Sequence, residues 1–388
     1  MSRQLLARQL RELMGSVDSL LQVYDTDSIV DANAALQKRF DACNAAGVAV
    51  HQHWVQTEAR ARGAPHAARA TAALDWIQPC VDAGVVPWLS RALKLTPPKA
   101  ARVPDGAAPL GARRNAASSL VIVGPSAFML LEHLLDQIFE LMVYGDAQHK
   151  ARAQQLLATL HGRDFMAPAA AAFRAWTLFT ACLALPPTRE ALDAGGGYDA
   201  AGCLVQAAAA HSAGALAACK YSRIGCALLV NRMNACGLPA VHTAGAAAAA
   251  PVPAPVAELI DALASSRLVP VAAGMLLGAP LVDEALLPRA PGVPHPRDRL
   301  AVDVQAAAKE AGQALCALQS AHMRLVIVRG ATSGPGVTEL GRLLDSPDVT
   351  ALRHALLERL AAHGGLAAAA AEGGGGAAEE RAWRRRRG

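Results

Sequence analysis

Residues 75–95 read DWIQPCVDAGVVPWLSRALKL, and this stretch decides the predicted fold. Gly84 suits the left-handed backbone conformation that closes a helix. Pro87 has no N–H, so it fits best in the first turn of a new helix, where that donor would lack a partner anyway. The apolar residues that follow recur at spacings of three and four, at Val86, Leu89 and Leu93, with Trp88 one step off this face. The stretch therefore predicts two helices joined by a short break.

A second stretch, residues 268–277 (LVPVAAGMLL), aligns with the first around its own proline. Three positions match, namely Val86 with Val269, Pro87 with Pro270 and Leu93 with Leu276. Arg267 stands where the first stretch has Gly84. The pattern G-V-V-P-x-L-x-x-x-L resembles the entry to the long third helix of an armadillo repeat.

A third stretch, residues 340–360, reads LGRLLDSPDVTALRHALLERL and resembles the helix–turn–helix joints of armadillo and HEAT-type repeats. Leu343 and Leu344 would end one helix, and residues 346–348 (SPD) would form the turn. The next helix would face inward with Val349, Leu352, Leu356 and Leu360. The chain shows no regular period of about 40 residues, which such repeats require. We therefore predict an all-α fold, an irregular armadillo- or HEAT-like stack of helical hairpins, with an irregular helical bundle as the alternative.

Residues 259–277 and 346–366 also resemble the Ala-rich helical region of green-algal proteins that carry a C-terminal MYND zinc finger. No cysteine follows Gly365, so the finger itself is absent from this chain. The resemblance therefore implies the helical region alone, without the zinc or the peptide-binding role of the finger.

The composition favours helices with close, small contacts, because the 53% hydrophobic content is largely alanine and aromatic residues make up only 4%. The net charge is +5, and residues 373–388 contribute +3 of it, so the body of the chain implies no strong polyanion partner. The eight cysteines form no C-x-x-C pair, which favours free thiols in a reducing compartment. Residues 120–144, the most apolar region, contain four ionisable side chains, too many for a membrane span.

Low-complexity segments suggest the domain organisation. An Ala-rich helical domain is predicted over 1–242, with a Pro- and Gly-rich loop at 96–118. A linker at 243–255 precedes a second helical region over 256–366, and a disordered Ala/Gly/Arg tail is predicted over 367–388. Within the first domain, residues 128–142 form the clearest amphipathic helix. Its predicted inward residues are Leu131, Leu134, Leu135, Ile138 and Met142, and its predicted outward residues are Glu132, His133, Asp136, Gln137 and Glu140.

One motif suggests a nucleotide. Residues 326–336 (VIVRGATSGPG) resemble the nucleotide loop of short-chain dehydrogenases, with Gly330, Gly334 and Gly336 in the glycine positions. Pro335 removes an N–H from the cradle, Arg329 replaces the usual Thr, and too little chain follows for the rest of that fold. We therefore expect a helix end and a loop here.

Two other motifs are weaker still. His51 and His53, with Cys43 upstream, suggest a metal, but two histidines at i and i+2 on a helix point apart. Cys219, Cys226 and Cys236 follow helical spacing, which favours buried thiols.

We accordingly predict a non-enzymatic protein–protein interaction scaffold, with no catalytic, cofactor-binding or metal-ligating residue and an unidentified protein partner. Two alternatives stay open: a nucleotide-dependent enzyme using residues 330–336, and nucleic-acid binding through the Arg-rich tail. The expected compartment is the cytoplasm, with the nucleus (through Arg384–Arg387) or an organelle as alternatives. Neither nucleic acid nor membrane is the expected partner.

Overall fold

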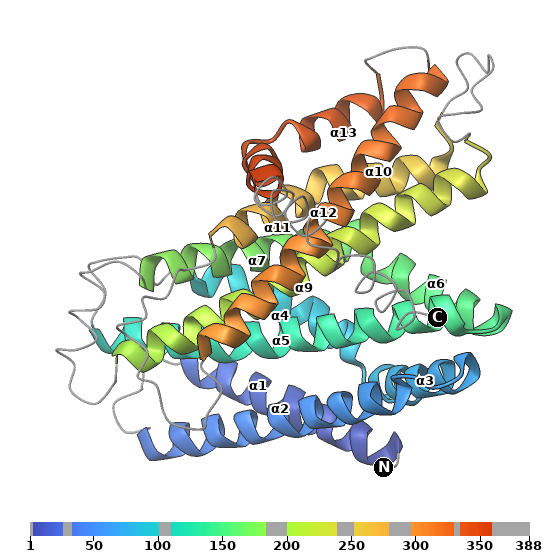
Figure 1. Cartoon of the computed structure of the whole chain (residues 1–388). Helices are drawn as coiled ribbons and strands as arrows, with labels where there is room; N and C mark the ends of the chain where they lie inside the picture. The colour runs from blue at the N-terminus through green and yellow to red at the C-terminus, as the bar shows by residue number, and fades with distance from the viewer. Residues whose placement is uncertain are drawn as a thin grey trace, which may run out of the picture.

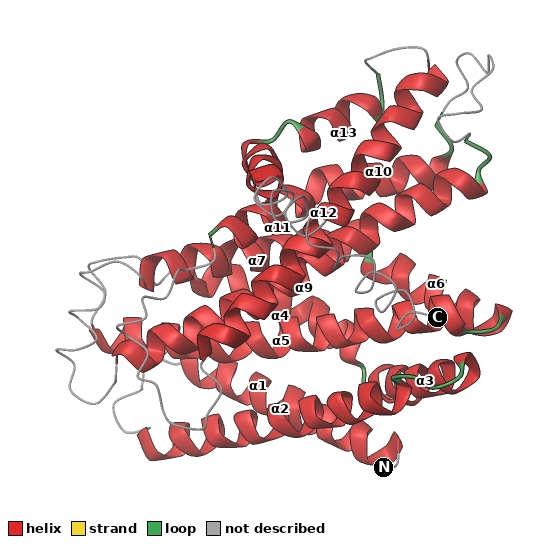
Figure 2. Cartoon of the chain, in the orientation of Figure 1, coloured by secondary structure: helices red, strands yellow, loops and turns green. Residues whose placement is uncertain are grey.

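The computed structural model describes residues 3–25, 33–100, 110–183, 200–238, 252–278, 296–329 and 334–358. Within these ranges every regular element is a helix and no strand occurs (Figure 2). The all-α prediction is therefore confirmed. The helices are α1 (Arg3–Asp25), α2 (Asn33–Ala61), α3 (His66–Asp82), α4 (Val85–Ala100), α5 (Leu110–Tyr144), α6 (Ala147–Leu160), α7 (Arg163–Leu183), α9 (Ala200–Ala235), α10 (Ala254–Ser266), α11 (Leu268–Leu277), α12 (Pro296–Arg329), α13 (Val337–Leu344) and an unlabelled helix at 347–358.

Helix α5 crosses the middle of the molecule (Figure 1). On one side it packs against α1, α2 and α3, and on the other against α4 and α9. Helix α9 in turn packs against α7, α11 and α12, and α10 bridges α7, α9 and α13. Because α5 has neighbours on both sides, it joins the N-terminal three helices to the rest of the fold, and α4 also contacts α1 and α3.

The two long helices α9 and α12 run parallel along one another. Arg223 of α9 is paired with Glu310 of α12, and further along both helices Arg324 of α12 donates to Asn234 at 2.5 Å. From the first contact to the second, the residue numbers increase along both helices, so the two helices run parallel. Helices α10 and α11 lie between α9 and α12 in sequence, and both pack on α7 and α9.

Three helices begin directly after a residue with left-handed backbone geometry. Gly84 (φ 75°) precedes α4, Arg267 (φ 55°) precedes α11, and Gly336 (φ 83°) precedes α13. The two proline-centred stretches therefore share the same joint, although an arginine stands where the first has glycine. Both of the helices that they start, α4 and α11, pack on α7.

Apolar faces of several helices form the core. The α1 residues Leu6, Leu10, Leu13, Val17 and Leu20 are fully buried, as are Trp76, Phe173 and Trp176, while Trp88 and Phe128 are almost fully so. The inward residues of the helix at 347–358 also pack in the core, except Leu360, which lies outside the described residues. Buried residues from both sides of 243–255 belong to one hydrophobic cluster.

Two predictions about residues 75–118 are wrong in part. The predicted loop at 96–118 is helical at both ends, because α4 continues to Ala100 and α5 begins at Leu110, a stretch rich in the strong helix formers Ala and Arg. Only 101–109 lie outside the described residues. On α4, Val85 and Trp88 face the core and Val86 is half-buried, so Trp88 belongs to the apolar stripe. Trp88 also donates its indole N–H to Asp18 of α1 at 3.0 Å.

The larger correction concerns α5. His133 and Gln137 are buried, and Glu132, Asp136 and Glu140 are only partly exposed, so the face predicted to meet solvent meets other helices instead. The prediction failed because it treated α5 as a surface helix with one buried side. The domain boundary at 243–255 and the tail at 367–388 fall mostly or wholly outside the described residues and stay predictions.

Candidate functional site

The polar side chains at 132–140 of α5 each meet a side chain from another helix. The Nζ of Lys220, on α9, lies 3.0 Å from Glu132 and 2.9 Å from an Asp136 carboxylate oxygen. The next residue of α5, Gln137, donates its amide N–H to Glu58 of α2 at 2.7 Å. These contacts link α5 to α2 on one side and to α9 on the other.

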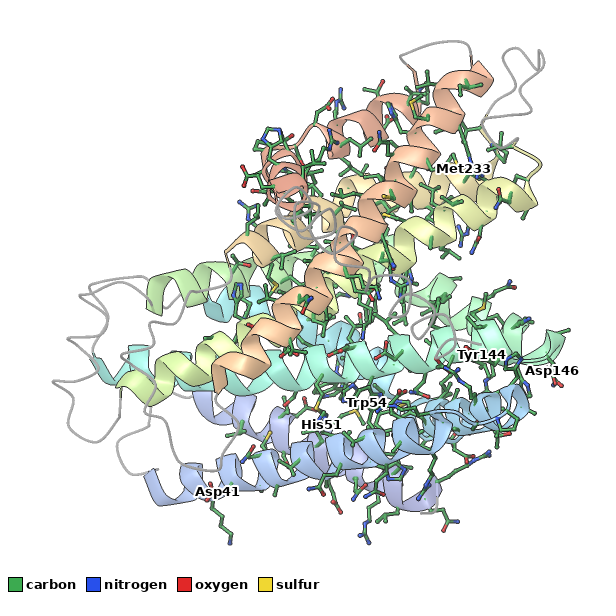
Figure 3. The ribbon with its side chains drawn as sticks, viewed as in Figure 1. Asp41, His51, Trp54, Tyr144, Asp146 and Met233 are labelled. Atoms are coloured by element: carbon green, nitrogen blue, oxygen red, sulfur yellow. The ribbon has the colours of Figure 1, made fainter. Side chains whose placement is uncertain are left out.

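The same row of carboxylates continues to Glu140. Arg69 of α3 donates two hydrogen bonds to it, each at 2.9 Å, in the two-pronged geometry that makes arginine–carboxylate pairs strong. The Arg69 guanidinium also lies 3.9 Å from the ring centroid of Tyr144, at the C-terminal end of α5 (Figure 3). Arg69 therefore fixes the end of α5 against α3.

Burial and the closeness of other charged groups shift the pKa values of the side chains in this row. Burial raises the pKa of Asp136 to about 6; Lys220 opposes that rise, and the neighbouring carboxylates Glu132 and Glu58 add to it. Burial acts to lower the pKa of Lys220, but Asp136 and Glu132 outweigh it and raise that pKa. Lys220 is therefore a permanent cation, which suits an ion pair and not a catalytic amine.

A group of rings from α2, α3 and α5 packs next to this row, and two of them, His51 and Trp54 of α2, are labelled in Figure 3. A ring nitrogen of His51 lies 3.1 Å from one of His133, and the Trp54 indole stacks on His133. Trp76 of α3 meets His133 edge-on, with ring centroids 5.9 Å apart. Burial, with smaller contributions from His51 and Lys220, holds the pKa of His133 well below its usual value. His133 is therefore neutral in the folded protein at pH 7.

Two apolar side chains of α5 remain at the surface next to the carboxylates. Phe139 is 42% exposed and Val143, one turn later, is 45% exposed. The Arg223 guanidinium lies 5.0 Å from the Phe139 ring centroid. We call the surface formed by Asp136, Phe139, Glu140 and Val143 the α5 strip; Glu58 flanks it from α2 and Arg223 from α9.

The charged groups on and around the α5 strip do not balance. The carboxylates are Glu58, Glu132, Asp136, Glu140 and Glu310, and the cations are Arg69, Lys220 and Arg223. With all of them ionised, these eight groups carry a net charge of about −2. Glu58 is the carboxylate with no ion-pair partner among the described residues. The α5 strip therefore combines exposed apolar groups with an excess of negative charge.

The glycine-rich loop has a different geometry from a phosphate cradle. Helix α12 ends at Arg329, residues 330–333 lie outside the described residues, and α13 begins at Val337. The Gly336 N–H donates to the Glu339 carboxylate at 2.5 Å, and the Gly334 N–H to the Thr338 hydroxyl at 3.2 Å. A phosphate at this helix start would have to displace the carboxylate of Glu339, so the geometry does not favour one.

The histidines and cysteines weighed for a metal are not brought together. His51 faces His133, whereas His53 lies against Trp76 with ring centroids 6.0 Å apart. In the described part of the chain, no group of three or more His, Cys, Asp or Glu side chains could hold a metal ion. Cys219 and Cys226 are buried as predicted, but Cys236 is exposed because α9 has already ended at Ala235.

The sequence contains a signal for the row of carboxylates on α5, although the amphipathic pattern of the helix does not reveal it. Glu132, Asp136 and Glu140 are spaced four apart, so they line one edge of the helix and could pair with cations from neighbours. The identity of those cations had no sequence signal, because Lys220 is 84 residues from Asp136.

Within the described residues, the α9 segment His211–Ala235 is long and apolar enough to cross a membrane, and the bent pair α10–α11 passes the same test together. Other helices bury 67% of the α9 window, and the core helix of a soluble protein meets the same criteria. No protein-family model, curated protein or solved structure matches the chain.

Proposed function

We propose that this protein is a non-enzymatic interaction scaffold, an irregular armadillo- or HEAT-like stack of helical hairpins, that binds partner proteins through the α5 strip. The observation that carries the proposal is the exposure of Phe139 and Val143, one turn apart, on a helix whose other faces are buried. Large apolar side chains at the centre of a polar rim are typical of binding hot spots.

The chemistry of the strip favours a basic partner. Its net negative charge would attract lysine and arginine side chains, while Phe139 and Val143 would accept an apolar anchor from the same partner. A helix or peptide with one aromatic or aliphatic anchor between basic residues meets both requirements. The expected partner is therefore a basic, amphipathic protein segment, and neither nucleic acid nor a membrane.

The repeat-like stacking rests on the shared joints. The helices α4, α11 and α13 all begin after a left-handed residue, and α4 and α11 flank the same helix, α7. Recurrent joints of this kind support a stack of hairpins, and stacked hairpins offer extended surfaces to partners. The free thiols at Cys43, Cys80, Cys219 and Cys226 support a reducing compartment, and we propose the cytoplasm.

Selection from a random peptide-display library tests the binding function. We expect the wild-type chain to enrich peptides that have an aromatic or aliphatic anchor flanked by arginine or lysine. The double variant F139S/V143S should lose them, because both anchoring contacts are removed while side chains that are already partly exposed cost little stability. The matched control is V302S on α12, where Val302 is 63% exposed and far from the strip in sequence. Circular dichroism of all three proteins checks that folding is unchanged.

The proposal fails if the library yields no peptide or if the enriched peptides bind F139S/V143S as tightly as wild type. Binding that V302S weakens and F139S/V143S does not would place the docking surface on α12 instead. A thermal shift with millimolar NADP or ATP tests the enzyme alternative, and a shift that variant G336A abolishes would support it.

A further inference from the structure

The described residues leave the α5 strip with an excess of negative charge and with two exposed apolar side chains, Phe139 and Val143. Glu58 has no ion-pair partner among them, and Asp136 and Glu140 each retain partial exposure although Lys220 and Arg69 bind them. Such a surface gains most from a ligand that brings several guanidinium groups, because arginine binds carboxylates with two parallel hydrogen bonds. It also requires a large apolar group to cover Phe139 and Val143.

The chain itself contains a segment with this composition. Residues 381–387 read RAWRRRR, in which Trp383 is preceded by one arginine and followed by four. No other stretch of the printed sequence has an aromatic residue beside four consecutive basic residues. The segment thus offers one aromatic anchor and five positive charges, against a strip with two exposed apolar side chains and a net charge of about −2.

The length of the connecting chain allows the contact. The last described residue, Glu358, ends the helix at 347–358. Residues 359–380, fully extended, span at most roughly 75 Å. A compact chain of this length has a radius of gyration of about 21 Å, so the extended connection is more than three times that radius.

We propose that residues 381–387 bind the α5 strip of the same molecule, with Trp383 against Phe139 and Val143 and the arginines against Glu58, Asp136 and Glu140. This inference rests on the proposed function of the strip and names its ligand class: a basic segment with an aromatic anchor. Bound in cis, the segment competes with partner proteins, so the chain regulates access to its own docking surface. A tethered ligand has an effective concentration of order 1 mM, so a segment that binds free at about 10 μM would weaken partner binding about 100-fold.

The test uses a fluorescein-labelled peptide of residues 378–388 and a chain truncated after Glu380, with fluorescence anisotropy as the readout. We expect the peptide to bind the truncated chain and to bind the full-length chain at least 10-fold more weakly. Binding to the truncated chain should fall at least 10-fold with F139S/V143S and with a W383A peptide, and should weaken as salt rises. The V302S variant of the truncated chain should bind as its parent does.

Equal binding of the peptide to full-length and truncated chains would overturn the inference, as would binding that F139S/V143S leaves unchanged. A full-length chain that dimerises by light scattering, where the truncated chain does not, would show that the segment acts on a second copy and would overturn the cis arrangement. A 20-base-pair DNA duplex that binds the full-length chain equally with and without F139S/V143S would show that residues 381–387 are not held on the α5 strip, and it would overturn the inference. Library peptides that bind the truncated chain through Phe139, when peptide 378–388 does not, would refute this inference and leave the proposed function intact.

Discussion

The Trp54 indole lies parallel to the His133 imidazole, with ring centroids 4.1 Å apart and an interplanar angle of 2°. This stack joins α2 to α5 without a hydrogen bond between the two rings. The Nδ1 of His133 and the indole N–H of Trp54 are both buried without a hydrogen-bond partner in the described structure. The stack therefore depends on a neutral imidazole, since an imidazolium would leave a charge there without a carboxylate bonded to it.

Stability should fall in mild acid because of His133. Its pKa lies well below 6.5 in the folded protein, chiefly through burial, and near 6.5 in the unfolded chain. Below pH 6.5 the unfolded chain binds more protons, so the free energy of unfolding decreases as pH falls, by up to about 1.4 kcal/mol per pH unit for one histidine. Variant H133F should flatten the urea-measured slope between pH 6.5 and 5 by about that amount.

Other groups with shifted pKa values contribute to the same slope. Burial also lowers the pKa values of His53 and His211, which act in the same direction as His133. Burial lowers the pKa of His161 to about 4, so it adds a slope of the same sign in H133F and wild type alike. Asp136, with a pKa of about 6, acts oppositely, since protonation on going from pH 6 to 4 favours the folded state. An H133F slope equal to wild type would contradict the prediction.

Removal of Lys220 should lower the free energy of unfolding, because the carboxylates beside it lose their cation. Variant K220M leaves Glu132 and Asp136 side by side in a largely buried interface, which should cost about 3 kcal/mol at pH 7 by urea unfolding. The triple variant K220M/E132Q/D136N should recover most of that loss, because no uncompensated charge remains. A loss below about 1 kcal/mol in K220M would mean that water solvates the carboxylates well enough without the lysine.

Helix α9 approaches α5 and α11 closely at Gly214. A Cβ there would lie 2.6 Å from Met275 Cε and 3.1 Å from Phe128 Cδ2. Met275 can move, but Phe128 is stacked on Phe173 with ring centroids 4.7 Å apart. Variant G214A should therefore destabilise the protein by about 1–3 kcal/mol. Gly15 of α1 is the matched control: no atom lies within 4 Å of its Cβ position, so G15A should stabilise by about 0.5–1 kcal/mol. Stabilisation by both variants would refute the close approach.

The residues before α4 and α11 both have a positive φ angle, so replacing Arg267 by glycine and replacing Gly84 by alanine should change stability in opposite directions. Arg267 holds a left-handed conformation at some cost, so R267G should stabilise the protein by about 0.5–1 kcal/mol. Gly84 has the same conformation without that cost, and G84A should destabilise it by about 1 kcal/mol. Thermal unfolding of the two variants measures both effects. Destabilisation by R267G would show that the Arg267 side chain contributes more than its backbone costs.

The sequence predicted the elements well where a helix has one buried side. In the printed sequence, leucines on α1 and alanines and leucines on α12 recur at 3–4 spacing, and the structure buries those faces. The same reasoning failed on α5, because hydrophobic periodicity reports which side chains avoid water and not which polar ones find partners. The candidate site depends on α5, where the spacing of Glu132, Asp136 and Glu140 was visible in the sequence but the side chains that meet them were not.

Local sequence determined the helices and their joints, since alanine content, proline position and the residue before each joint act over a few neighbouring residues. The tertiary structure alone decided that α9 and α12 run parallel and that α5 lies between α2 and α9. That placement brings Lys220 and Arg69 to the carboxylates of α5 across separations of 84 and 71 residues. The physical reason is that a carboxylate is stable away from water only when a cation reaches it, and the packing of the whole chain determines which cations do.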